Sequence, residues 1–219
     1  MNSIEITRSR ILAHRGLWAK ENEKNSLEAI RNAFNLGFGV EIDLREFDAN
    51  LVLSHDFPSV NSEKIEHIDE VWKLLNPNIT VAYNIKEDGL SNLLKQFLDQ
   101  CNIHNQFAFD MSVPESVKYK YLGIETALRV SEIEPVNLEH FATNDGIKKI
   151  WLDSFRTDWW IHDLKTLEAL RGSQIFIVSP ELHGRDPQKV WSQGKSLLAE
   201  NFDIYICTDH PVEVAKIWS

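Results

Sequence analysis

Short apolar runs alternate with longer segments of helical period along the whole chain. A short run bounded by turn residues predicts a strand, and apolar residues spaced three or four apart predict a helix. The expected strands cover residues 10–13, 38–44, 80–85, 106–109, 123–130, 149–152, 174–178 and 203–207, with residues 51–54 returning from the second strand as a hairpin. The expected helices cover residues 26–36, 66–75, 90–101, 114–121, 161–170, 187–199 and 212–218, the first of them capped by Asn25 or Ser26.

The pattern contains eight strand units, and each connection between them is long enough for parallel pairing. It therefore predicts an α/β fold, a compact (β/α)8 TIM barrel. No linker, repeat or low-complexity segment divides the chain, so residues 1–219 are expected to form a single domain. Barrels of this kind typically have about 250 residues, so several helices of this 219-residue chain must be brief.

The composition narrows the classes of partner. The 43% hydrophobic content is enough for a large core, and the net charge of −10 argues against a nucleic-acid or anionic-membrane partner. Cys101 and Cys207 show no CxxC spacing, so we expect buried free thiols. No apolar run reaches the roughly 18 residues of a membrane span, and no apolar segment precedes the first strand. The expected location is the cytoplasm, without integral membrane association.

Polar or charged residues stand at the carboxyl end of nearly every predicted strand, where TIM barrels carry their chemistry. They are His14, Arg15, Glu41, Asp43, Asn84, Lys86, Asp110, Arg129, Asp153, Glu181, Thr208 and Asp209. Ending core elements in this way is costly unless the polar groups serve a site. This edge of the barrel is the candidate active site.

Glu41 and Asp43 stand two apart on one predicted strand, so their side chains share a face. Oxygen ligands alone suit a hard cation such as Mg²⁺, Ca²⁺ or Mn²⁺ better than Zn²⁺. The alternative is that both carboxylates form salt bridges with Arg15, Arg45 or Lys86 around the rim.

Two histidines, His14 and His55, each follow an apolar run. Imidazole titrates near neutral pH, so a histidine pair beside a cation site suits general acid and base catalysis. Arg15 and Lys86 carry the positive charge needed to hold a phosphate.

These motifs together resemble the glycerophosphodiester phosphodiesterase family, within the larger group of phosphatidylinositol-phospholipase-C-like barrels. The resemblance is carried by His14-Arg15-Gly16, residues 23–26, Glu41-x-Asp43, the ending His55-Asp56, Asn84-x-Lys86 and Thr208-Asp209-x-Pro211. It is dense over residues 11–56 and sparse but ordered over the rest.

The resemblance implies a role for each matching residue. His14 and His55 match the acid/base histidines of the family, and Arg15 matches its phosphate-contacting arginine. Glu41 and Asp43 match ligands of a divalent cation, Mg²⁺ or Ca²⁺, with Mn²⁺ as a third candidate.

Asn84 is the main departure from the family pattern. The family has a third metal-binding glutamate at this position, two residues before the lysine that Lys86 matches. An amide oxygen can ligate a hard cation but contributes no charge. Either the cation binds more weakly, with Asn84 among its ligands, or Asp153 or Glu181 supplies the missing carboxylate.

A second candidate region follows the seventh predicted strand. Glu181, His183 and Arg185 lie near the expected barrel mouth, where loops build substrate selectivity. Arg129 and Trp151, on neighbouring strands, are further candidates for the substrate pocket, Trp151 as a stacking face for a sugar or glycerol. The alternative for this region is a loop that caps and packs helices.

The leading hypothesis is a metal-dependent phosphodiesterase that hydrolyses a small glycerol- or sugar-linked phosphodiester by histidine acid/base catalysis. A related alternative is a lyase that stops at a cyclic phosphate. A third is a non-catalytic phosphodiester-binding barrel, which Asn84 favours and the retained histidines oppose.

Overall fold

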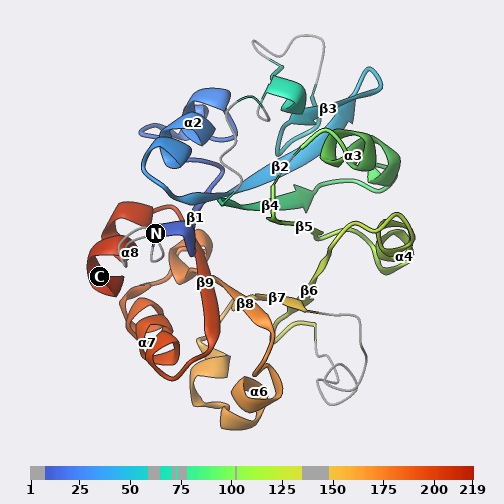
Figure 1. Ribbon diagram of the computed structural model, residues 1–219. Coiled ribbons are helices and arrows are strands. Elements are labelled where there is room, and N and C mark those ends of the chain that lie inside the picture. Colours follow the sequence, from blue (N-terminus) through green and yellow to red (C-terminus); the bar gives the residue numbers. More distant parts are fainter. Residues whose placement is uncertain (1–7, 59–64, 71–72, 74–77, 102, 135–147) are drawn as a thin grey trace. The chain divides into compact units, whose positions relative to one another are not determined.

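The computed structural model describes residues 8–58, 65–70, 73, 78–101, 103–134 and 148–219 (Figure 1). The helix expected over residues 66–75 lies partly outside this range. Inside it, the chain forms the short 3-10 turn η2 (Ile68–Glu70). Within the described residues no helix is both long and apolar enough to cross a membrane.

All eight parallel strands expected from the sequence are present. They are β1 (Ile11–His14), β2 (Gly39–Phe47), β4 (Thr80–Ile85), β5 (Asn105–Phe109), β6 (Ala127–Val130), β7 (Lys149–Leu152), β8 (Gln174–Val178) and β9 (Asp203–Thr208). The hairpin return is β3 (Asn50–Leu53), which pairs antiparallel with β2. The order of strands and helices is that of a (β/α)8 TIM barrel, so the predicted fold class is confirmed.

Two elements differ from their predicted bounds. The strand expected from residue 123 begins at Ala127, after Gly123 has ended the preceding helix with a φ of 72°. The helix expected over residues 161–170 is divided into η4 (Trp159–His162) and α6 (Leu164–Ala169). Asp163 causes this division, because its side chain accepts a hydrogen bond from the Thr166 backbone and starts a new helix there.

The chain forms two compact units, residues 12–126 and residues 1–11 with 127–219. Whether residues 1–219 act as one domain stays a prediction. In the first unit the parallel strands run in the order β5-β4-β2-β1, and β3 pairs with the carboxyl-terminal half of β2. Its helices are α2 (Leu27–Asn35), α3 (Ser91–Leu98) and α4 (Val113–Tyr121), with the short turn η1 (Glu21–Glu23) before α2.

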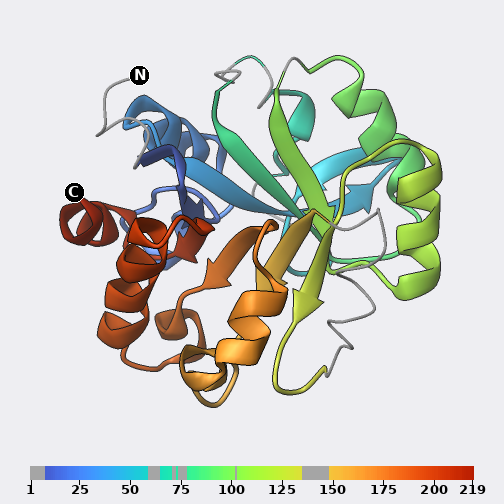
Figure 2. The same ribbon diagram turned by 60° about the horizontal axis from the view of Figure 1, so that its bottom comes forward.

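The second unit carries strands β9-β8-β7-β6, whose yellow to red ribbons can be followed in Figure 2. Its helices after α6 are α7 (Gln188–Ala199) and α8 (Pro211–Trp218), with the turn η5 (Pro180–His183) after β8. The indole of Trp218 lies against α7 and donates its Nε1 to the Trp191 carbonyl oxygen at 2.9 Å. Neither cysteine forms a disulfide in the part of the chain that the structure describes; Cys207 is buried as expected, whereas Cys101 is partly exposed.

Parallel register in the first unit brings the candidate site residues together. His14 at the end of β1 stands beside Glu41 of β2. Two residues further along β2, Asp43 stands beside Asn84 of β4. Residues 41, 43 and 45 share one face of β2 because side chains alternate along a strand. This face therefore carries two acidic residues and one basic residue.

The turn that leaves β1 requires a glycine. Gly16 has a φ of 87°, and a Cβ there would lie 2.7 Å from the Ala29 carbonyl carbon. We expect Gly16→Ala to lower the free energy of unfolding by about 2 kcal/mol or more, because it combines backbone strain with overpacking. Urea denaturation measures the loss.

Gly123 provides the matched control, because its φ is 72° but a Cβ there meets nothing within 4 Å. Gly123→Ala should cost only the backbone term, about 1 kcal/mol. Equal losses in the two variants would contradict the close contact between the turn after β1 and helix α2.

Candidate functional site

The site begins where β1 turns into the segment toward α2. His14 Nε2 lies 3.9 Å from Glu41 Oε2. Arg15 then adopts a left-handed backbone with a φ of 59°. This conformation turns the Arg15 amide toward β2, where it donates to the backbone oxygen of Glu41 at 2.9 Å and lies 3.2 Å from Oε2 of the same residue.

Asp43 is the centre of the cluster and is fully buried. Its Oδ2 lies 2.8 Å from Arg15 Nε, and its Oδ1 lies 3.0 Å from Lys86 Nζ. Both cations reach it from neighbouring elements, Arg15 from the end of β1 and Lys86 from the residue after β4. The predicted alternative of rim salt bridges therefore describes the contacts of Asp43.

Asn25 is a site residue that sequence reasoning placed in the family-like run of residues 23–26 and among the candidates for helix capping, but without a contact with Asp43. Its side-chain amide donates to Asp43 Oδ2 at 2.7 Å, and its oxygen accepts from the Asp43 backbone at 3.1 Å. Ser26 caps α2 instead, by accepting from the Ala29 backbone. Asn25 has a φ of 57°, which asparagine tolerates better than most residues. That preference was the available signal in the sequence.

Glu41 is the second buried acid and is 1% exposed. Its Oε1 accepts a hydrogen bond from Asn84 Nδ2 at 3.0 Å. Burial raises the pKa of the Glu41 carboxyl, and the neighbouring charge of Asp43 raises it further. His14, Lys86 and the bond from Asn84 oppose this shift.

His55 lies after β3 and is exposed. Its Nδ1 lies 2.9 Å from Asp56 Oδ1, and this bond lowers the pKa of the Asp56 carboxyl. Arg45 on β2 donates from Nε to the His55 backbone oxygen at 3.0 Å and stacks on the Phe57 ring. Arg45 thus positions the His55 segment, a role not inferred from the sequence. The pairing of His14 with His55 across one substrate stays a prediction.

The cluster fits a divalent cation poorly. Asp43 faces two cations of its own chain, and Asn84 directs its amide nitrogen toward Glu41. Within the described part of the chain, no three Asp, Glu, His or Cys side chains are grouped as metal ligands. Two buried oxygens without a hydrogen-bond partner, Asn84 Oδ1 and Asp43 Oδ1, favour a cation, although Asp43 Oδ1 already lies 3.0 Å from Lys86 Nζ. The expected Mg²⁺, Ca²⁺ or Mn²⁺ stays a prediction that this donor set does not support.

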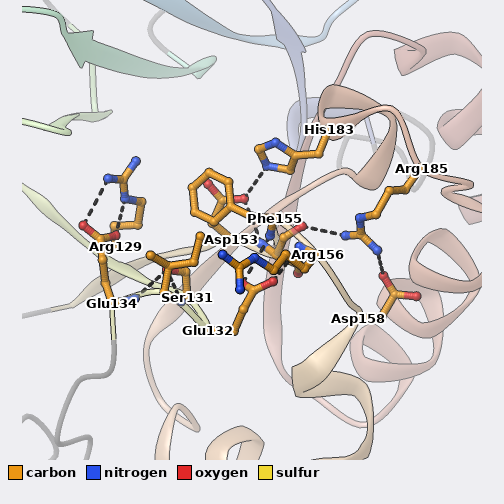
Figure 3. A network of polar contacts seen from close by, with 12 residues as sticks. Arg129, Ser131, Glu132, Glu134, Asp153, Phe155, Arg156, Asp158, His183 and Arg185 are labelled. Atoms are coloured by element: carbon orange, nitrogen blue, oxygen red, sulfur yellow. Dashed lines mark hydrogen bonds and ion pairs between the residues drawn. The ribbon is translucent and has the colours of Figure 1, made fainter.

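The second unit holds a separate polar network at the ends of β6, β7 and β8 (Figure 3). Asp153, 4% exposed, accepts from its neighbour Ser154 and lies 2.7 Å from His183 Nε2 through the same oxygen. The His183 ring packs on Phe155, with 4.7 Å between ring centroids. Asp153 was expected to ligate a cation, and in this unit its partner is His183.

The remaining candidates of this region are engaged in local contacts. Arg185 bridges Asp158 and the Ser154 carbonyl oxygen, both at 2.6 Å. Arg129 forms a two-pronged ion pair with Glu134, which Figure 3 shows directed away from His183.

Glu181 accepts bonds from Ser179, Thr208 and the Asp209 backbone, so it fastens the loop after β9. Trp151 is buried and stacks on Phe176 with 6.4 Å between centroids. These contacts match the capping and packing alternative; the roles of these residues in a substrate pocket stay predictions.

The sequence matches no family model and no curated protein. Solved structures do match over nearly the whole chain. A glycerophosphodiester phosphodiesterase from Thermotoga maritima is 20% identical, with a TM-score of 0.67 and coverage of 94% of this chain and 96% of that one. An enzyme of the same name from Agrobacterium tumefaciens is 17% identical, with a TM-score of 0.69 and coverage of 94% and 99%. The chain has the fold of these phosphodiesterases.

A third match is a phosphodiesterase from Oleispira antarctica, solved in complex with the product sn-glycerol-3-phosphate. It is 17% identical, covers 99% of both chains and has a TM-score of 0.65. The fold expected from the resemblance of the sequence motifs to the glycerophosphodiester phosphodiesterases is therefore confirmed.

The buried Glu41 should cost the protein stability at neutral pH. Its folded pKa is raised, so folding is opposed more strongly as pH rises from the ordinary glutamate range through that folded pKa. Glu41→Gln removes this cost, and Asn84 can turn its unpartnered oxygen toward the new amide. We expect a gain of about 1 kcal/mol at pH 7, a rise in Tm of roughly 2–4 °C for a chain of this size.

Thermal melts of wild type and Glu41→Gln at pH 4 and pH 7 measure this effect. The gain should shrink at the lower pH, where the wild-type carboxyl is protonated. A variant that is less stable than wild type at pH 7 would show that the ionised carboxylate is a net stabiliser.

Proposed function

We propose that the protein is a phosphodiesterase that hydrolyses a small glycerol- or sugar-linked phosphodiester. The observation that carries the proposal is the cluster in which Asp43 holds Arg15 and Lys86, while Glu41 on the same face of β2 lies 3.9 Å from His14. Two cations and an imidazole held by one pair of strand acids suit the binding and cleavage of an oxyanion. Support from the fold comes from the phosphodiesterases of like structure, one of which was solved with glycerol-3-phosphate.

In the proposed mechanism Arg15 and Lys86 bind the non-bridging oxygens of the phosphodiester. Their charge stabilises the additional negative charge of the transition state. Asp43 and Asn25 act on the substrate only through Arg15 and Lys86, by holding them in place.

The histidines move the protons. One imidazole takes the proton of the nucleophile, a water or a neighbouring substrate hydroxyl, as its oxygen bonds to phosphorus. The bond from phosphorus to the leaving oxygen breaks, and the other imidazole gives that oxygen its proton. Water yields a phosphomonoester and an alcohol, whereas a substrate hydroxyl yields a cyclic phosphate.

The test is turnover of glycerophosphodiesters and of bis(p-nitrophenyl) phosphate by wild type, His14→Ala and His55→Ala. Each substitution removes one proton-transfer group, so each should lower kcat by roughly a hundredfold or more. Product analysis by phosphorus NMR distinguishes hydrolysis from release of a cyclic phosphate.

His104→Ala is the control, because His104 is exposed, lies in the same unit and is not part of the cluster. It should retain wild-type kcat. Full activity in His14→Ala or in His55→Ala would rule out the two-histidine mechanism.

A further inference from the structure

The charges around Asp43 are balanced by the chain itself. The two carboxylates of Glu41 and Asp43 meet the two cations of Arg15 and Lys86. A guanidinium keeps its charge in proteins. A divalent cation added to this set would leave two positive charges uncompensated in a largely buried site, which is unfavourable.

The oxygens of both carboxylates also face donors of this chain. Glu41 Oε1 accepts from Asn84, and its Oε2 lies 3.2 Å from the Arg15 backbone nitrogen. Asp43 Oδ1 faces Lys86, and its Oδ2 faces Arg15 and Asn25. Hard cations require six or more oxygen ligands. To share Asp43, a cation would have to lie close to Lys86 and Arg15 or displace them.

Asn84, which is uncharged, leaves the net charge of the cluster at zero. Carboxylate oxygens only accept hydrogen bonds when ionised, so Asn84 must present its amide nitrogen to Glu41. The other amide atom, Oδ1, is buried without a hydrogen-bond partner and carries no formal charge. A carboxylate at this position would make the set negative by one charge and would supply oxygens in place of a donor.

We propose that Arg15 and Lys86 bind the phosphoryl group of the ligand without a resident divalent cation, and that Asn84 is the residue that keeps the cluster from binding one. The side chains of Arg15 and Lys86 are 20% and 19% exposed, so both reach solvent from buried anchors. A guanidinium carries five N–H donors and an ammonium three. Contact with Asp43 therefore leaves donors on both for an oxyanion.

Direct binding of Mn²⁺ tests the cation half of the proposal. Electron paramagnetic resonance of free Mn²⁺ is followed during titration of the chelator-treated protein. Wild type and Asn84→Gln should show no saturable Mn²⁺ binding in the millimolar range. Asn84→Glu should bind Mn²⁺ saturably, with an affinity at least tenfold above the limit set by wild type. Glutamine matches glutamate in size, so the comparison isolates the charge. Saturable Mn²⁺ binding by wild type would overturn the proposal, whether or not the variants fold.

Calorimetry with sn-glycerol 3-phosphate and with inorganic phosphate, in the presence of EDTA, tests the anion half. Wild type should bind both, and Lys86→Met should bind them about tenfold or more weakly, the loss expected for one hydrogen bond to a charged group. Absence of binding in EDTA would overturn the proposal, as would its appearance only when Mg²⁺, Ca²⁺ or Mn²⁺ is restored.

The inference rests on the proposed function only for the nature of the ligand. Phosphate binding in EDTA without turnover of any phosphodiester would support this inference and refute the phosphodiesterase. Turnover that requires added cation, together with Mn²⁺ binding by wild type, would support the phosphodiesterase and refute this inference.

Discussion

The buried carboxylate of Asp43 is the constraint on which the site depends. An ionised acid with no exposed surface is tolerated only when partners replace the water it has lost. Here the partners are Arg15, Lys86 and Asn25, which come from three separate segments of the chain. Satisfying one acid therefore fixes two cations close together, where their mutual repulsion would otherwise keep them apart.

The backbone contributes as much as the side chains to the assembly of the site. Parallel register sets His14 beside Glu41 and Asp43 beside Asn84, so strand pairing alone brings four side chains to one edge. The left-handed turn at Arg15 then directs a peptide amide at Glu41. Gly16 allows that turn to lie against α2 without a side chain in the way.

Much of this arrangement could be predicted from the sequence. The strands had the right number and nearly the right bounds because buried parallel strands are marked by short apolar runs. The strand ends then identified His14, Glu41, Asp43 and Lys86. The run of residues 23–26 marked the loop that holds Asn25, but the contact of Asn25 with Asp43 was not predicted, because it joins residues 18 apart in sequence and depends on the conformation of that loop. Arg45 was expected only as a salt-bridge partner of the two carboxylates, and its contact with the His55 carbonyl oxygen was missed because it has no sequence signature.

Strand carboxylates can bind a metal cation or pair with the charged side chains of their own chain, and this choice shows a limit of motif-based inference. A Glu-x-Asp pair on a strand indicates shared oxygens, but not which cation they will face. In this protein the neighbouring residues decide, because Arg15 and Lys86 are close enough to Asp43 to take that place. Asn84 adds a donor to the same set. The same two acids would have a different electrostatic partner in a more negative setting.

The placement of these contacts along the chain has a consequence for protein synthesis. His14, Arg15, Asn25, Glu41, Asp43, Asn84 and Lys86 all belong to the compact unit of residues 12–126. Chains are made from the amino terminus, and compact units can form as they emerge from the ribosome. The last member of the cluster, Lys86, is thus already in the nascent chain while all of β5 to β9 remains to be translated.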